Sequence, residues 1–109
     1  MTIKNITSKK ILSRSAREAK SIKDKTLGLI FDDKTKSLVI TTRFGIHTHL
    51  MDSPIDILIL DKNHKVVKIK ESLKPNRIFI WNPKFSRVIE LPKGTVRKTK
   101  TKIGDRIGF

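Results

Sequence analysis

The residues best suited to chemistry are two histidines at alternate positions, His47 and His49, followed by Met51. In a β-strand, alternate side chains lie on the same face, so the spacing predicts that these three share one face. Two imidazoles that project in the same direction can bind one metal ion, but a tetrahedral site needs further ligands. The chain offers three candidates and does not select among them: Asp52, Asp56 and His64.

A ligand-binding or catalytic interpretation of this face adds two carboxylates, giving the candidate set His47, His49, Asp56 and Glu90. Acid–base catalysis requires two groups that converge in one cleft, which sequence spacing does not determine. In the competing structural interpretation, the histidines form hydrogen bonds within a half-buried strand and Met51 fills core space. The chain contains no nucleophile elbow, P-loop or paired His–Glu helix motif. We therefore assign no catalytic residue, metal or cofactor, and the sequence favours a protein without enzymatic activity.

The elements that would position these residues are mostly strands. The most apolar run, residues 55–61, carries apolar side chains on both faces and predicts a central strand covered on both sides. Pro54 has no N–H, so it suits the first position of that strand. Residues 15–18 form a capping-box pattern, which predicts a helix over residues 16–27.

Short runs separated by turn residues predict the other strands, at residues 37–42, 65–70, 78–81, 85–91, 95–102 and 106–109. The turn at residues 62–64 is expected to leave His64 exposed. Regular short strands of this kind favour a mainly β fold, a compact single-domain sandwich or barrel with one short N-terminal helix. Residues 1–12 are expected to form a basic arm or a short strand, and residues 13–109 a single β domain.

Short motifs follow one another in a fixed order along nearly the whole chain: Gly28-Leu29-Ile30, Gly45-Ile46-His47-Thr48-His49-Leu50-Met51, Pro54-Ile55-Asp56, Leu60-Asp61, Glu90-Leu91-Pro92-Lys93-Gly94 and Gly104-Asp105. This ordered set resembles the DUF192 family, small domains of unknown function from bacteria and archaea. Many members read GLM at the first motif and WMKNT at residues 49–53, so this chain departs from the common pattern there. The resemblance implies a β-sandwich of jelly-roll type and carries over no catalytic residue.

Net charge is the strongest compositional signal, with 25 Lys and Arg against 10 Asp and Glu, a formal net charge of +15. The excess lies in the flanking thirds, because residues 1–36 carry +6 and residues 74–109 carry +8, whereas residues 37–73 carry +1. Such a surplus destabilises the compact state through self-repulsion. The distribution favours a polyanionic partner, of which nucleic acid is the commonest. The alternative is a basic surface composition shared by the proteins of the organism.

We predict a non-enzymatic basic binding module that associates with RNA rather than DNA, or with a ribonucleoprotein such as the ribosome, through contacts with phosphates. The strand predicted at residues 95–102 would place alternate lysines on one face. Trp81 and Phe85, beside Arg77, would add to RNA affinity by stacking on bases. A tryptophan in an apolar run is also typical of a hydrophobic core, so Trp81 fits either role. The predicted RNA-binding residues are Arg97, Lys98, Lys100, Lys102, Arg77, Arg17, Lys9 and Lys10.

A third function class also stays open: a protein-interaction domain, including one with protein partners inside a ribonucleoprotein. No run reaches the roughly 20 apolar residues of a membrane span, and the first residues show no apolar stretch of signal-peptide length. The sequence therefore predicts a cytoplasmic protein without a membrane span. The chain has no cysteine, which excludes disulfides and thiolate chemistry.

Overall fold

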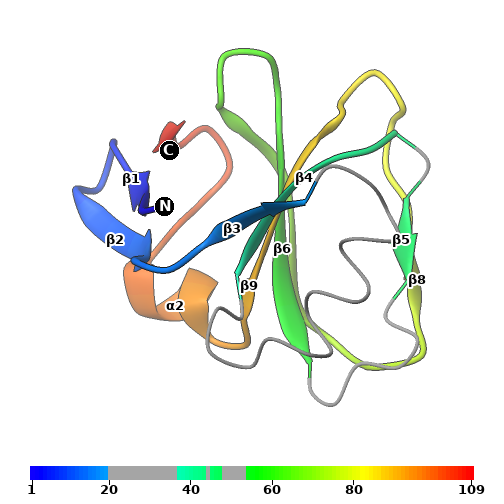
Figure 1. Ribbon diagram of the computed structural model, residues 1–109. Helices are drawn as coiled ribbons and strands as arrows, with labels where there is room; N and C mark the ends of the chain where they lie inside the picture. The colour runs from blue at the N-terminus through cyan, green and yellow to red at the C-terminus, as the bar shows by residue number, and fades with distance from the viewer. Residues whose placement is uncertain (20–36, 44, 48–53) are drawn as a thin grey trace.

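The computed structural model describes residues 1–19, 37–43, 45–47 and 54–109. The strands are β1 (Ile3–Asn5), β2 (Lys10–Ser13), β3 (Arg17–Ala19), β4 (Leu38–Thr41), β5 (Ile46–His47), β6 (Ile55–Leu60), β7 (Val66–Leu73), β8 (Ile78–Phe79), β9 (Arg87–Pro92) and β10 (Ile107–Gly108), and helix α2 spans Thr95–Thr99. The strands form sheets in the orders β3-β4-β9-β6-β7, β10-β1-β2 and β5-β8 (Figure 1). The described part of the chain is therefore mainly β, as predicted, and its one short helix lies near the C-terminus and not at the predicted N-terminal position.

Strand β6 lies inside the five-stranded sheet, where it pairs antiparallel with β7 on one side and with β9 on the other. All six of its residues are buried. Leu58 and Leu60 belong to one buried apolar cluster, whereas Ile57 and Ile59 belong to another. Because alternate residues of a strand lie on opposite faces, these two clusters cover the two faces of the sheet. The predicted central strand is confirmed.

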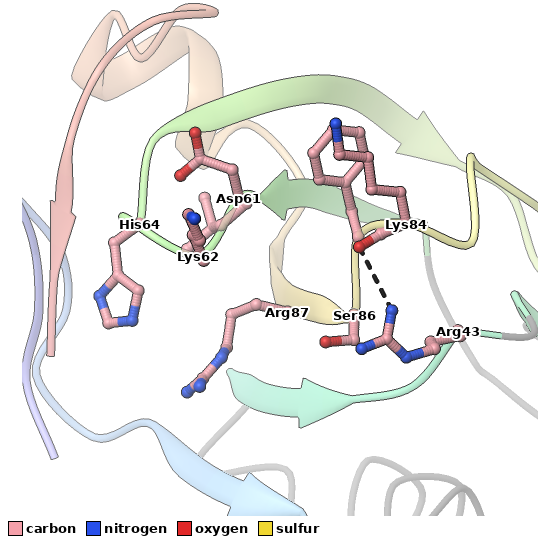
Figure 2. A pocket seen from close by; sticks show the side chains of 9 residues that line it. Arg43, Asp61, Lys62, His64, Lys84, Ser86 and Arg87 are labelled. Carbon is pink, nitrogen blue, oxygen red and sulfur yellow. Dashed lines mark hydrogen bonds between the residues drawn. The ribbon is translucent and has the colours of Figure 1, made fainter.

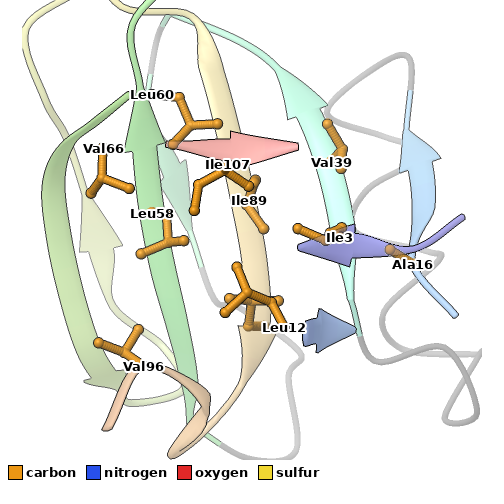
Figure 3. Close-up of a cluster of buried hydrophobic side chains, with 11 residues drawn as sticks. Ile3, Leu12, Ala16, Val39, Leu58, Leu60, Val66, Ile89, Val96 and Ile107 are labelled. Atoms are coloured by element: carbon orange, nitrogen blue, oxygen red, sulfur yellow. The ribbon is translucent and has the colours of Figure 1, made fainter. Parts of the chain in front are cut away.

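The first cluster joins the five-stranded sheet to a layer made from both ends of the sequence. We define this terminal layer as residues 1–16 and 93–109, which contain β1, β2, α2 and β10. Ile3, Leu12, Val96 and Ile107 point inward from it and pack against apolar residues of the sheet (Figure 3). The layer therefore has an apolar inner face. Its exposed side chains include apolar ones, among them Ile6, Ile11 and Ile103, as well as the polar and charged ones.

The second cluster covers the other face of the five-stranded sheet, beneath the segment that contains β8. Phe79 and Trp81 are buried there, and the indole Nε1 of Trp81 donates a hydrogen bond of 2.7 Å to the carbonyl oxygen of Phe85. Trp81 is therefore a core residue. The alternate residues Ile78 and Ile80 are 78% and 66% exposed, so the strand predicted to be buried at residues 78–81 is buried on one face only.

The predicted N-terminal helix is wrong where the structure describes it. Residues Arg17–Ala19 form β3, which pairs parallel with β4, and the backbone N–H of Arg17 donates to the carbonyl of Ser37 at 3.0 Å. Residues 20–27 of that prediction lie outside the described residues. A capping-box pattern is a local signal, and a buried partner strand supplied by β4 prevails over it because tertiary pairing outweighs small local preferences.

The strand predicted at residues 95–102 is also wrong, because α2 occupies its first half. Gly94 turns the chain at φ 89°, and the backbone N–H of Val96 donates to Oδ2 of Asp56 at 2.9 Å. The hydroxyl of Thr99 donates back to the carbonyl of Thr95 at 2.7 Å. Threonine and valine favour strands on propensity alone, but a buried carboxylate from β6 satisfies the start of the helix. The alternate lysines therefore do not share one strand face.

Candidate functional site

The terminal layer carries a concentrated positive charge. Its two segments contain ten Lys and Arg residues, all with exposed side chains, and a single acidic side chain, that of Asp105. The cations are Lys4, Lys9, Lys10, Arg14, Lys93, Arg97, Lys98, Lys100, Lys102 and Arg106. Strand pairing brings the two segments together, since β1 lies between β2 and β10. Residues about 90 positions apart in sequence thus contribute to one cationic surface.

The one acidic side chain of this layer does not neutralise the exposed cations. Asp105 is only 2% exposed, and its Oδ2 accepts hydrogen bonds from Nδ2 of Asn5 at 2.8 Å and from the backbone N–H of Lys102 at 3.0 Å. Nδ2 of Asn5 also donates to the hydroxyl of Thr101 at 3.2 Å. A buried carboxylate needs such donors to offset its lost hydration. Asp105 therefore fixes the layer internally and leaves the outer face positive.

Most of the predicted RNA-binding residues come together on this layer. Helix α2 packs against β2 and exposes Arg97 and Lys98, while Val96 and Thr99 face inward. Arg77 is separated from them, because it immediately precedes β8 on the opposite side of the central sheet (Figure 1). The six predicted residues within the terminal layer are Lys9, Lys10, Arg97, Lys98, Lys100 and Lys102, and Arg17 lies close to it on β3.

The alternative site at the histidines is described only in part. His47 is in β5, where it pairs with Ile78 of β8, whereas His49, Met51 and Asp52 lie outside the described residues. Within the described ranges, no three His, Asp or Glu side chains gather closely enough to hold a metal ion. In the same part of the chain, no helix has the length and apolarity needed to cross a membrane.

The two carboxylates of that alternative set, Asp56 and Glu90, are fully buried on adjacent strands but point to opposite faces of the sheet. Asp56 pairs with Leu91, and the next residue of β6, Ile57, pairs with Glu90. Paired residues share a face and neighbours alternate. Both oxygens of Asp56 accept backbone hydrogen bonds, from Ser72 at 2.9 Å and from Val96 at 2.9 Å. Asp56 and Glu90 therefore do not converge on one cleft.

A basic pocket that the sequence did not predict lies at one end of the central sheet. There β4 and β6 end and β9 begins, because Arg87 pairs with both Thr41 and Leu60. The cavity has a volume of about 220 Å³. Its charged and hydroxyl lining residues, shown in Figure 2, include Arg43, Asp61, Lys62, Lys84, Ser86 and Arg87.

Backbone contacts hold Arg43 at the wall of this pocket. Its Nη1 donates to the carbonyl oxygens of Pro83 at 2.8 Å and of Lys84 at 3.2 Å. The backbone N–H of Thr42 donates to the carbonyl of Ser86 at 2.8 Å, which continues the pairing of β4 with β9. Figure 2 shows Ser86 between the side chains of Arg43 and Arg87. The end of the sheet thus places two guanidinium groups on either side of one hydroxyl-bearing residue.

The turn between β6 and β7 forms the opposite wall. Oδ1 of Asp61 accepts hydrogen bonds from the backbone N–H groups of Asn63 at 2.8 Å and Lys65 at 2.9 Å, which closes the turn. The positive φ of 64° falls on His64, whose ring stacks on Phe109 with centroids 4.5 Å apart. His64 is therefore half-buried and not simply exposed as predicted.

Sequence reasoning missed this pocket because its cations come from three separate parts of the chain and show no spacing pattern. Arg43 follows β4, Lys62 belongs to the turn after β6, and Arg87 opens β9. The sequence does show basic residues beside the ends of the predicted strands. Because the ends of neighbouring strands meet at one edge of a sheet, these residues could have indicated a basic site there. Strand order was needed to group them, and the sequence does not give it.

The sequence matches one protein-family model and two curated proteins. The model of the DUF192 family, described as "Uncharacterized ACR", matches residues 3–109. The UPF0127 protein PH1112 of Pyrococcus horikoshii is 36% identical over 97 residues, covering 84% of each chain. The UPF0127 protein PYRAB11210 of Pyrococcus abyssi is 35% identical over 72 residues, covering 64% of this chain and 61% of that protein.

Two solved structures are similar in fold at low sequence identity. A protein of unknown function from Novosphingobium aromaticivorans has a TM-score of 0.79 at 17% identity, covering 99% of this chain and 82% of its own. A protein from Sinorhizobium meliloti, named as a proposed transcription regulator, has a TM-score of 0.74 at 16% identity, covering 98% of this chain and 89% of its own. At this identity the likeness establishes a shared fold.

Proposed function

The chain belongs to the DUF192 family, and from its terminal layer we propose that it is a non-enzymatic cytoplasmic module that associates with RNA, alone or within a ribonucleoprotein. The observation that carries the proposal is the set of ten exposed cations on residues 1–16 and 93–109, whose single acidic side chain is buried. Exposed Lys and Arg bind phosphates and release counterions, which supplies affinity without reading base sequence.

The arrangement of these cations favours binding to RNA over base-specific recognition of DNA. Reading the major groove of B-DNA requires a helix or a β-ribbon that enters the groove. Helix α2 has five residues and packs Val96 and Thr99 inward, so it offers little length for that purpose. A broad surface of separate cations suits contacts with the phosphates and 2′-hydroxyls of folded RNA.

We propose further that the fold is a sandwich of jelly-roll type, as the resemblance to this family implies. Support comes from the two apolar clusters on opposite faces of the five-stranded sheet. The order β3-β4-β9-β6-β7 also places strands that are distant in sequence side by side, which is typical of Greek-key connections.

Sedimentation of a native cell lysate through a sucrose gradient tests the association with RNA. We expect the protein to migrate with large particles at low salt and to move to the top of the gradient after ribonuclease treatment. Raising the salt should release it as well, because phosphate contacts weaken with counterion concentration. The matched variant Lys98→Gln/Lys102→Gln should remain nearer the top of the gradient than the wild type.

A protein that stays at the top of the gradient in every condition would contradict the proposal. A stable complex that survives both ribonuclease and high salt would contradict it too, and would favour a protein-interaction domain instead. The double variant Lys68→Gln/Lys70→Gln serves as the control, because it removes the same charge from exposed positions on β7, outside the terminal layer.

A further inference from the structure

We infer that the pocket between the end of β4, the turn after β6 and the start of β9 binds a phosphate group, supplied either as inorganic phosphate or as a small phosphate monoester. The inference concerns different residues from the terminal layer and does not rest on the association with RNA. It is carried by the charge, the fixed donor geometry and the size of the cavity.

The charge of the pocket favours an anion. Four permanent cations, Arg43, Lys62, Lys84 and Arg87, line it together with one carboxylate, Asp61, so that four positive charges minus one leave a net charge of +3. Oδ1 of Asp61 already accepts two backbone hydrogen bonds, at 2.8 and 2.9 Å. Like charges gathered around a small cavity repel each other and concentrate an anion there.

The donors are held in place before any ligand arrives. Both carbonyl contacts of Arg43 use its Nη1, so among the described contacts its Nε and Nη2 donors remain for a ligand. Arg87 is anchored by its position in β9 and lies with its guanidinium carbon 5.7 Å from the centre of the Phe109 ring. Orienting groups before binding reduces the entropy that is lost when a ligand binds.

The shape of the pocket selects phosphate over a carboxylate. Guanidinium groups bind phosphate oxygens in pairs with two parallel hydrogen bonds. Arg43 and Arg87 lie on opposite sides of Ser86 (Figure 2), so a ligand that contacts both guanidinium groups needs oxygens that point in several directions. A tetrahedral phosphate has them, whereas the two oxygens of a planar carboxylate form one pair of parallel hydrogen bonds with a single guanidinium.

The size of the pocket limits the rest of the ligand. A volume of about 220 Å³ is smaller than the roughly 300–1,000 Å³ of pockets that enclose drug-sized molecules. The cavity therefore accommodates the phosphate and a small esterified group. Lys84 closes one side of it, with its ammonium 5.9 Å from the centre of the Phe85 ring.

Titration of the ¹⁵N-labelled full chain, followed by ¹H–¹⁵N correlation spectra, tests the inference. Inorganic phosphate is added in one arm and glycerol 3-phosphate in the other, with sodium chloride at matched ionic strength as the reference. We expect saturable shifts of the Lys62, Ser86 and Arg87 amides in at least one arm. The arm that binds more tightly identifies free or esterified phosphate as the source.

Variants separate this site from general electrostatic attraction. Arg87→Gln should weaken binding about tenfold, since a charge-assisted hydrogen bond contributes about 1.5 kcal/mol or more. Ser86→Ala leaves the charge unchanged and should weaken binding about threefold, as expected for a neutral hydrogen bond. Lys98→Gln removes the same charge as Arg87→Gln but lies in the terminal layer, and should change the affinity by less than about twofold because of screening.

Three results would overturn the inference. They are shifts that rise without saturation in both arms, shifts spread over the terminal layer instead of the pocket, and equal losses for Arg87→Gln and Lys98→Gln. The amide spectrum of each variant also reports whether it is folded. Failure of the RNA proposal would leave these results unchanged, because Lys98→Gln/Lys102→Gln tests the terminal layer alone.

Discussion

The carboxylate of Asp56 accepts a hydrogen bond of 2.9 Å from the backbone N–H of Val96, forty residues further along the chain. Its other oxygen accepts from the backbone N–H of Ser72, also at 2.9 Å. One fully buried side chain in the central strand thus holds both the irregular end of β7 and the start of α2. The cationic helix of the terminal layer depends on this contact for its position.

Replacing Asp56 by alanine should lower the free energy of unfolding by about 3 kcal/mol, because the buried N–H of Val96 and the more exposed N–H of Ser72 both lose a charged acceptor. Asp56→Asn should cost less, since the amide oxygen can still accept from one of the two donors. Urea unfolding of each variant measures the effect. Glu71→Ala is the control at an exposed position on β7, and should stay within about 0.5 kcal/mol of the wild type. An equally small loss for Asp56→Ala would show that the carboxylate does not support the helix.

The contact between Asn5 and Asp105 predicts a pH dependence in an engineered variant. Asn5→Asp places a second carboxyl where Nδ2 now lies 2.8 Å from Oδ2 of Asp105. Burial and the adjacent carboxylate raise the pKa of the introduced group in the folded state above its unfolded value of about 3.9. The folded state then binds more protons than the unfolded state, so the variant loses stability as pH rises above about 4.

Unfolding midpoints in urea at pH 4 and pH 7 check this prediction against Asn5→Ala. The alanine variant loses both donor contacts of Nδ2 and introduces no carboxyl. It also loses the hydrogen bond of 3.0 Å that Oδ1 accepts from the backbone N–H of Ser8, a loss that does not depend on pH. Asn5→Asp should therefore lose stability relative to Asn5→Ala as the pH rises from 4 to 7. A difference that does not change with pH would mean that the introduced group is not placed beside Asp105.

Two glycines with similar backbone angles provide another internal comparison. Gly45 has φ +88° and Gly94 has φ +89°, but a Cβ at Gly45 would lie 2.9 Å from the carbonyl oxygen of Phe79, whereas a Cβ at Gly94 has open space. Gly94→Ala should cost about 1 kcal/mol from the left-handed conformation alone. Gly45→Ala should cost about 2–3 kcal/mol, because the backbone of β8 must also move. Equal losses in thermal or urea unfolding would contradict the close approach of residue 45 to β8.

Much of this architecture followed from the sequence where the signal was carried by buried apolar residues. The run at residues 55–61 predicted β6 because a short run that is apolar on both faces is typical of a strand inside a covered sheet. The strands β4, β7 and β9 were likewise predicted from runs between turns. Their order in the sheet was not, because pairing between distant strands leaves no local pattern.

The two errors in predicted secondary structure, the helix that begins at residue 16 and the strand at residues 95–102, share one cause. The segments 16–19 and 95–99 took their secondary structure from distant partners, β4 in the first case and Asp56 in the second. Local propensity predicted a helix in the first segment and a strand in the second. For the candidate site, net charge correctly identified the flanking thirds as basic, but only the fold brought residues 1–16 and 93–109 onto one layer and separated Arg77 from them.

Two pairs of substitutions separate the contribution of the terminal layer to RNA affinity from that of the net charge. Lys98→Gln/Lys102→Gln should weaken binding of a generic single-stranded RNA and lower the salt slope by about 1.4, if each lysine neutralises one phosphate. Lys68→Gln/Lys70→Gln removes the same charge from exposed positions on β7, outside the terminal layer. Fluorescence anisotropy of labelled RNA should show little change in slope for this control. Equal effects of the two pairs would attribute binding to net charge and not to the layer.

The central claim is that the terminal layer binds phosphates, and the salt dependence of RNA affinity tests it most directly. The dissociation constant of the full-length protein for a labelled RNA is measured between about 50 and 300 mM potassium chloride, concentrations chosen to span roughly the physiological range. If about five of the ten cations contact phosphates of a single-stranded RNA, the slope of log affinity against log salt should be about −3.5. A slope near zero, or no measurable binding at about 50 mM salt, would contradict the account.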